Sequence, residues 1–312
     1  MREPPPGRHL PPRNVAVIVN PTGRRSLDSV ERALDRARPQ GSRTTVLLTA
    51  DTGDATQLAA SVRDDADLVV AVGGDGTVSE VAAGLVGASV PLGIVPAGST
   101  NIVARELGIP SGLPAAVRLL FGPHRIVVRD LGRCGDRIFL HMAGAGLDAR
   151  FFQRTNRELK RHVGWLAYVP AAAMALAEPP SLITVIADET TVVAESPLVI
   201  VANGTSVVHP AIKLHPAIRS DDGWLDVLLF TGTDPTAVAR TIIKFGVGQL
   251  DDSPELVVLR ARHVSIVALP PVPVQLDGDA VGTTPITIDL LPAAIQLVVP
   301  LPYTNVSTKL SV

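Results

Sequence analysis

The chain is poor in aromatic residues, in cysteine and in net charge, and each shortage excludes certain kinds of core, metal site or binding partner. Aromatic side chains make up 3% of the 312 residues, so a core must be built mainly from Val, Leu, Ile and Ala. The single cysteine, Cys134, excludes an intramolecular disulfide and a cysteine-based zinc cluster. A formal net charge of −2 gives no broad attraction to nucleic acid. We expect a cytoplasmic protein that does not bind nucleic acid.

Long hydrophobic runs are also missing from the sequence. No stretch reaches the ~18 uninterrupted apolar residues of a membrane-spanning helix. Residues 1–13 are rich in Pro with scattered Arg and lack the apolar centre of a signal peptide, so we expect a flexible tail there. We expect a second tail at 301–312, after the last predicted strand. The chain as a whole is nevertheless 46% hydrophobic and 19% charged, which is enough for sizeable cores. Its length predicts about two domains.

The segment Asp67–Glu80 is the most informative one. Its apolar, β-branched start predicts a buried strand of a parallel sheet, and a glycine-rich turn and an amphipathic helix follow. Strand, glycine turn and helix together can bring backbone N–H groups and a helix N-terminus against phosphate. Asp75 lies within this turn, and a carboxylate beside phosphate requires a cation or a donor between them. We interpret it as part of a metal–nucleotide site; the alternative is a tight turn in which Asp75 caps the helix.

Similar turns follow three other predicted strands. Asn14–Val19 leads into a turn at 20–26, Thr44–Leu48 ends at Thr49, and Val90–Val95 leads into Pro96–Asn101. Helices follow from about 27 to 38, from 55 to 62, and through 102–107. Strands alternating with helices over short links predict a parallel sheet covered on both faces, a three-layer α/β domain. Ligands of such sheets bind beyond the carboxyl ends of the strands, where these turns lie.

The pattern changes after Pro123, where short strands separated by turns predict an antiparallel β-sandwich. We therefore predict an α/β domain at 14–125 and a β-sandwich domain at 126–300, with helical insertions at about 148–177 and 235–247. The expected strands span 126–131, 138–142, 182–187, 191–193, 198–202, 225–230, 256–259, 264–269, 272–276, 286–290 and 295–299. Edge strands of such a sandwich could pair between subunits in a homodimer.

The first insertion places basic residues, 150–162, before an aromatic and apolar stretch that contains Trp165 and Tyr168. Such a segment can rest on an anionic membrane surface, which would make the protein peripheral at the inner membrane face. The alternative is a solvated basic face on a helix whose other side packs against the core.

Taken in order, these motifs resemble the diacylglycerol kinase catalytic-domain family, and most closely its bacterial soluble lipid kinases. The likeness covers nearly the whole chain after the tail. Gly-Gly-Asp-Gly-Thr alone is shared with NAD kinases and phosphofructokinases, whereas the ordered set is far more specific. The segments that carry the resemblance are Asn20–Pro21, Gly73–Thr77, Pro96–Asn101, Ala143–Asp148, Ser220–Val227 and Gln275–Asp279.

The resemblance implies an ATP-dependent kinase that phosphorylates a lipid hydroxyl between an α/β domain and a β-sandwich domain. It implies a Mg²⁺ ion held by Asp222 and by main-chain oxygens of Arg219 and Trp224. Asp277 would take the proton of the lipid hydroxyl, with Asp279 beside it, and Asp75 would belong to the metal and phosphate network. The ATP-binding residues carried over by position are Asn20, Pro21, Thr22, Gly23, Arg24, Thr49, Gly74, Asp75, Gly76, Thr77, Val78, Ser79, Glu80 and Ser99.

The residues by themselves leave alternatives open for the last of these motifs. Asp277 follows an apolar strand in a glycine-bearing turn, which suits a base but equally suits an Asp-Gly hairpin turn. The Asp221–Gly223 segment can likewise be both a turn and a ligand loop. The chain departs from the family where Ile102 replaces a frequent Asp, where Asp279 replaces the usual Glu, and where Gly23 directly follows Thr22.

The function that we expect is phosphorylation of a lipid hydroxyl by ATP and Mg²⁺, with diacylglycerol or a related lipid as acceptor. One alternative is a kinase for a soluble acceptor such as NAD. Another is a catalytically inactive lipid-binding regulator, which the departures at Ile102 and Asp279 would suit.

Overall fold

The computed structural model describes residues 11–146, 180–207, 209–215, 217–232, 234, 236–237, 244 and 253–301. The chain forms two compact units, one of residues 1–129 with 293–312 and the other of residues 130–292. The chain therefore leaves the first unit near Arg129 and returns to it near its end.

The first unit is built on a parallel sheet of the order β2-β1-β3-β4, with the end of the last strand beside β4. Strand β3 is buried along its whole length, as its continuous apolar sequence predicts. The registers place the carboxyl ends of all four strands at one edge, because Val19 lies opposite both Leu48 and Val72, and Gly73 lies opposite Pro96. The strands are β1 (Asn14–Val19), β2 (Arg43–Leu48), β3 (Leu68–Gly73) and β4 (Leu92–Pro96).

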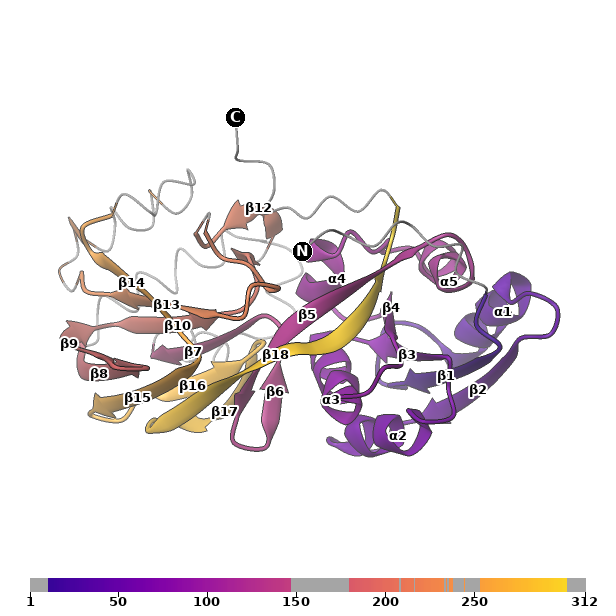
Figure 1. The fold of residues 1–312 in the computed structure, drawn as a ribbon, viewed down its shortest axis with the longest axis horizontal. Helices are drawn as coiled ribbons and strands as arrows, with labels where there is room; N and C mark the ends of the chain where they lie inside the picture. The colour runs from indigo at the N-terminus through magenta and orange to yellow at the C-terminus, as the bar shows by residue number, and fades with distance from the viewer. Residues whose placement is uncertain are drawn as a thin grey trace. The chain divides into compact units, whose positions relative to one another are not determined.

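Helices cover both faces of this sheet, which confirms the predicted three-layer α/β arrangement (Figure 1). Helices α1 (Leu27–Ala37) and α5 (Leu113–Phe121) pack together, and so do α2 (Asp54–Val62) and α3 (Asp75–Leu85). A short helix, α4 (Ile102–Glu106), follows β4. Helix α5 is not among the helices that the sequence pattern predicts.

Close packing of α2 against α3 depends on Gly84. A Cβ atom at this position would lie 2.4 Å from the carbonyl oxygen of Thr56 and 2.7 Å from the Cβ atom of Ala59. We expect Gly84→Ala to lower the free energy of unfolding by about 1–3 kcal/mol, because the helices must separate. Gly112→Ala is the control, since a Cβ there meets no atom within 4 Å. Urea denaturation of both variants measures the difference, and equal stabilities would refute the packing argument.

The second unit is an antiparallel β-sandwich, as predicted. One sheet has the order β14-β13-β10-β7-β16-β17, and the other joins the start of β18 to β15, β8 and β9. The two sheets share one core of buried aliphatic side chains and Phe139. Its strands are β7 (Met142–Gly146), β8 (Ser181–Ala187), β9 (Thr190–Ser196), β10 (Leu198–Ala202), β13 (Leu225–Phe230), β14 (Leu256–Ala261), β15 (His263–Leu269), β16 (Pro273–Leu276), β17 (Asp279–Thr283) and β18 (Ile286–Val299).

Four further strands complete the described chain. The long strand β5 (Arg125–Cys134) pairs with β6 (Arg137–Phe139) and with β18. The short strands β11 (Ser206–Val207) and β12 (His209–Lys213) pair with each other. Strands β11, β12 and β17 are not among those predicted from the sequence, and neither is β7 beyond Met142.

Two predicted strand assignments were wrong. The segment 138–142 is not one strand, because β6 ends at Phe139 and β7 begins at Met142. Leu140 and His141 lie between these two strands, and their amides donate to the carboxylate of Asp277 instead of to a neighbouring strand. Conversely, the two strands expected at 286–290 and 295–299 are one, β18, which continues through Pro292.

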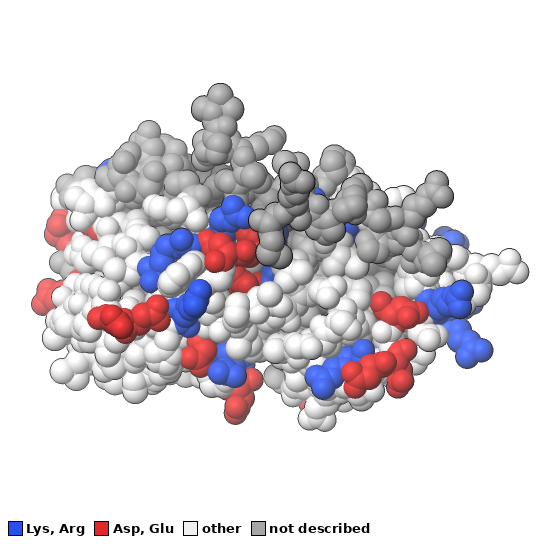
Figure 2. All heavy atoms as spheres, viewed as in Figure 1, with Lys and Arg blue, Asp and Glu red and all other residues white. Residues whose placement is uncertain are grey.

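Charged side chains of both signs lie interspersed on the face shown in Figure 2. Among the residues that the structure describes, no helix is long and apolar enough to cross a membrane. The predicted helical insertion at 148–177, with its basic and aromatic segment, lies outside the described residues, and so does most of the insertion at 235–247.

Candidate active site

Three turns meet at the carboxyl edge of the sheet in the first unit, at 20–24, 73–77 and 96–101. The amide of Asn20 donates to the carbonyl of Val72, and the amide of Ala97 donates to the carbonyl of Gly73. The amide of Arg24 in turn donates to the carbonyl of Ala97 at 2.9 Å. The turns that the sequence predicted at one edge are therefore joined to one another by backbone hydrogen bonds.

Side chains connect the same turns. The amide group of Asn20 donates to the hydroxyl of Thr77 at 3.3 Å, and the guanidinium of Arg24 donates to the hydroxyl of Ser99 at 3.1 Å. Asn20 also accepts from the amide and the hydroxyl of Thr22, which closes the first turn. These contacts bring five of the predicted ATP-binding residues into one cluster.

Two glycines permit the closest approach between turns. A Cβ atom on Gly98 would lie 2.5 Å from the Cα atom of Gly74, and one on Gly74 would lie 3.2 Å from the Cα atom of Gly98. Backbone therefore packs directly on backbone where the 73–77 and 96–101 turns meet. Only glycine, which has no Cβ atom, allows this close approach.

Asp75 is the first residue of α3, and Gly74 occupies the cap position. Its Oδ1 atom accepts a hydrogen bond of 3.3 Å from the amide of Val103, in the first turn of α4. The carboxylate thus connects the starts of two helices. Asn101 closes the 96–101 turn by accepting from the amide of Gly98 and donating to its carbonyl, each at 2.9 Å, while Ile102 is buried beside it.

The other predicted ATP-binding residues lie directly after β2, within α3, or in the 20–24 turn. Thr49 is buried directly after β2, and its amide donates to the carbonyl of Val19, the residue before the first turn. Val78 and Ser79 are buried within α3, and the carbonyl of Glu80 accepts from the hydroxyl of Thr56 in α2. Side chains of Val78 and Ser79 therefore belong to the packing of α3. Pro21 is exposed, Gly23 makes a backbone turn with Asn20, and Gly76 lies in the first turn of α3.

Asp277 lies in the second unit, in the turn between β16 and β17. Both Asp277 and Gly278 have positive φ, at 49° and 93°, as two-residue hairpin turns of type I′ require. The carboxylate accepts backbone hydrogen bonds of 2.8–3.0 Å from the amides of Leu140, His141 and Met142. The hairpin-turn interpretation is therefore correct, and the turn in addition fixes the orientation of a carboxylate.

Asp279 begins β17 and pairs in register with Leu276 across the hairpin. Its side chain is exposed, whereas the Asp277 side chain is half-buried. The turn thus presents two carboxylates of different exposure within three residues.

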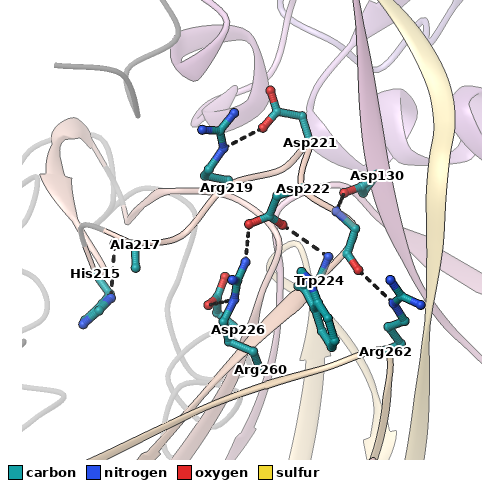
Figure 3. Close-up of polar contacts among 11 residues, drawn as sticks. Asp130, His215, Ala217, Arg219, Asp221, Asp222, Trp224, Asp226, Arg260 and Arg262 are labelled. Carbon is teal, nitrogen blue, oxygen red and sulfur yellow. Dashed lines mark hydrogen bonds and ion pairs between the residues drawn. The ribbon is translucent and has the colours of Figure 1, made fainter. Parts of the chain in front are cut away.

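The loop at 219–224 is held by contacts on several sides (Figure 3). The buried Asp130 carboxylate accepts from the amide of Gly223 at 2.8 Å, and Asp222 accepts from the amide of Trp224 at 3.2 Å. The other oxygen of Asp222 pairs with the guanidinium of Arg260. Arg219 pairs with Asp221 at 3.0 Å. The Mg²⁺ ion expected at Arg219, Asp222 and Trp224 stays a prediction, and Asp222 binds an arginine.

Sequence reasoning missed two members of this cluster. Asp226 is 1% exposed, and burial raises the pKa of its carboxyl to about 7, although Arg260 opposes that rise. Arg260 lies directly across from Asp226 in the pairing of β13 with β14. Alternation along the strand puts the Asp226 side chain on the sheet face opposite to Leu225 and Val227. Only the pairing of β13 with β14 shows that Arg260 is its neighbour on that face.

The protein therefore has a cluster of glycine-bearing turns on an α/β sheet in one unit and an oriented carboxylate in the β-sandwich of the other. A family model described as "Diacylglycerol kinase catalytic domain" matches residues 14–134, and one described as "YegS C-terminal NAD kinase beta sandwich-like domain" matches residues 141–299. The chain belongs to the diacylglycerol kinase catalytic-domain family, with a C-terminal domain of the YegS type. The predicted family and fold class are confirmed.

Individual relatives agree with this assignment. A protein named diacylglycerol kinase from Mycobacterium tuberculosis is 30% identical over 92% of this chain and 95% of its own length. An uncharacterized protein from Synechocystis is 29% identical over 237 residues. The matched residues are 74% of this chain and 54% of that longer protein. The crystal structure of a putative diacylglycerol kinase from Bacillus anthracis matches the fold with a TM-score of 0.78 at 24% identity, over 95% of this chain and 98% of that one.

Proposed function

We propose that this protein is an ATP-dependent lipid kinase that transfers the γ-phosphate to the hydroxyl of diacylglycerol or a related lipid. The observation that carries the proposal is the 30% identity to a diacylglycerol kinase over 92% of this chain and nearly all of that protein. The turn cluster and the Asp277 carboxylate supply the chemical reasons.

The turns at 20–24, 73–77 and 96–101 bind the phosphates of ATP. Small residues at the carboxyl edge of a parallel sheet leave backbone N–H groups and the N-terminus of α3 facing the ligand position. The Gly74–Gly98 contact holds the 73–77 and 96–101 turns against each other, so that backbone N–H groups of both turns can act on one anion. Arg24, which Ser99 holds at 3.1 Å, adds a guanidinium beside the same turns.

Asp277 orients the lipid hydroxyl and takes its proton. The hydroxyl oxygen forms a new bond to the γ-phosphorus, the bond from that phosphorus to the β,γ-bridging oxygen breaks, and ADP leaves. Three backbone amides fix the Asp277 carboxylate, so little reorganisation is needed when the hydroxyl arrives. The exposed Asp279 lies beside it and adds negative charge.

Mg²⁺ accompanies ATP in this proposal and neutralises charge on the transferring phosphate. Asp75 is the carboxylate of the turn cluster that would face such an ion. Its Oδ1 atom is positioned by the amide of Val103, which suits a group that holds one orientation toward the nucleotide.

The proposal is tested by identifying which acceptor the protein phosphorylates. Purified protein is incubated with ATP and Mg²⁺ together with diacylglycerol, sphingosine, a total lipid extract or NAD, and mass spectrometry identifies what gains phosphate. We expect phosphorylated diacylglycerol or a related lipid and unchanged NAD. Phosphorylation of NAD alone would replace the proposal with a soluble-acceptor kinase. ATP binding without turnover on any acceptor would favour an inactive regulator.

A further inference from the structure

The loop at 219–224 and the start of β13 surround one guanidinium group. Arg260 projects from β14 between two carboxylates, with one of its terminal nitrogens paired to Asp222. Its Nε atom lies 3.3 Å from Oδ1 of Asp226. Figure 3 shows these three side chains converging beside the ring of Trp224.

Among the described residues, Arg260 is the cation that pairs with both Asp222 and Asp226. Asp226 is 1% exposed and its two oxygens have no hydrogen-bond partner among the described residues, so the ion pair with Arg260 is the contact that offsets their burial. Asp222 is 20% exposed and has one oxygen on the amide of Trp224 and the other on Arg260. One delocalised, forked cation therefore serves both carboxylates.

The strand pairing makes this arrangement a property of the fold. Asp226 and Arg260 are direct partners across the antiparallel β13–β14 pair, so their Cβ atoms are neighbours whatever the loop does. Trp224 also packs beneath two guanidinium groups, with the Arg262 carbon 4.7 Å and the Arg260 carbon 5.8 Å from the ring centroid. Arg262 further donates to the carbonyl of Gly223 at 3.3 Å.

A divalent ion at Asp222 does not fit this set of contacts. Mg²⁺ needs close to octahedral oxygen coordination at about 2.0–2.1 Å, and would have to displace the guanidinium from Asp222. Displacement would leave the buried Asp226 carboxylate with its partner removed or moved, and the incoming ion would be repelled by the charge of Arg260. Among the described residues, no group of three or more His, Cys, Asp or Glu side chains is arranged to hold a metal.

We propose that the Arg260 guanidinium is the resident cation of the 219–224 loop, and that it takes the place of the divalent ion that the family resemblance assigns to Asp222. The loop is then held in place by a charge built into the chain. This inference concerns loop structure and does not depend on the proposed lipid kinase activity.

The first test measures metal binding in the whole protein without nucleotide. Mn²⁺ serves as a paramagnetic probe in place of Mg²⁺, and titrations compare the unsubstituted protein with Asp222→Asn. We expect the two proteins to bind Mn²⁺ equally, because Arg260 already neutralises Asp222. A Mn²⁺ site in the unsubstituted protein that Asp222→Asn abolishes would overturn the proposal, and this comparison requires no variant of Arg260.

The second test removes the built-in cation and offers a metal instead. We expect Arg260→Gln to lower the thermal unfolding midpoint by on the order of 5 °C or more, since two carboxylates lose their partner. Millimolar Mg²⁺ should restore part of that loss in Arg260→Gln and leave the unsubstituted protein unchanged. The double variant Arg260→Gln with Asp222→Asn should lose the Mg²⁺ response.

Arg262→Gln is the matched control, because Arg262 stacks on Trp224 and holds Gly223 but makes no ion pair with Asp222. It should show no response to Mg²⁺. An Arg260→Gln protein as stable as the unsubstituted one would contradict the proposal. So would stabilisation of the unsubstituted protein by Mg²⁺ that depends on Asp222. Neither result would bear on lipid phosphorylation, which is measured separately.

Discussion

Asp277→Asn should lower the rate of ATP-dependent lipid phosphorylation on the order of 10²- to 10⁴-fold, which is the contribution typical of a positioned general base. The carboxylate accepts from three consecutive amides, those of Leu140, His141 and Met142. Asparagine preserves the size and the Oδ1 acceptor but cannot take a proton from the lipid hydroxyl. Initial rates with saturating ATP, and with lipid in mixed micelles, measure the effect.

This substitution also costs a hydrogen bond, so its effect on stability needs its own control. An amide nitrogen would face the N–H of Leu140 in place of Oδ2, which should cost about 1–3 kcal/mol. Asp188 offers a close structural match, because it also has a φ of 49° and its carboxylate accepts from the amides of Arg262 and His263. Asp188→Asn should lose comparable stability and keep its turnover. Equal losses of turnover in both variants would mean that Asp277 acts only through the fold.

Gly98→Ala should weaken ATP binding by tenfold or more while the lipid-side chemistry remains intact. The added Cβ would lie 2.5 Å from the Cα atom of Gly74 and 2.9 Å from Oδ1 of Asn101, and both neighbours are fixed by the turns. The two turns must therefore separate, and the backbone amides that face the phosphates move with them. A tenfold loss corresponds to about 1.4 kcal/mol, within the cost of forcing a methyl group into a packed site.

Calorimetric titration with ATP and Mg²⁺ measures that loss directly. Gly112→Ala is the control, because a Cβ at this position meets no atom within 4 Å and Gly112 is the cap residue of α5, outside the turns at 20–24, 73–77 and 96–101. It should bind ATP as the unsubstituted protein does. Unchanged ATP affinity in Gly98→Ala would remove the 96–101 turn from the proposed nucleotide site.

The α/β unit could be predicted from the sequence in most of its elements because its signals are local. Continuous apolar runs such as Leu68–Val72 mark buried parallel strands, and each is followed by a turn and an amphipathic helix. Helix α5 was missed although Pro114 at its first turn and Gly122 after its end are ordinary helix boundaries. The end of β18 was assigned to the sandwich, since nothing local shows that Leu297 pairs with Leu92, more than two hundred residues away.

The candidate site was predictable where a motif names a residue and unpredictable where strand pairing brings residues together. The positions of Asp75, Asp222 and Asp277 could be selected from glycine-bearing turns and the family resemblance. The break at Leu140–His141, which supplies amides to Asp277, interrupts an apolar run that looks like one strand. The register of β13 with β14 brings Arg260 opposite Asp226, and the ion pair of Arg260 with Asp222 in the preceding loop follows from that position, which no local sequence pattern indicates.

In the proposed function, phosphate passes from ATP to a lipid hydroxyl on this protein. The most direct test of this transfer incubates the purified protein with ATP labelled at the γ-phosphate and diacylglycerol, and counts label in the lipid against ADP formed. We predict equal amounts of labelled phosphatidate and ADP, with neither formed when diacylglycerol is omitted. ADP accumulating with its label in free phosphate, and none in lipid, would contradict the account.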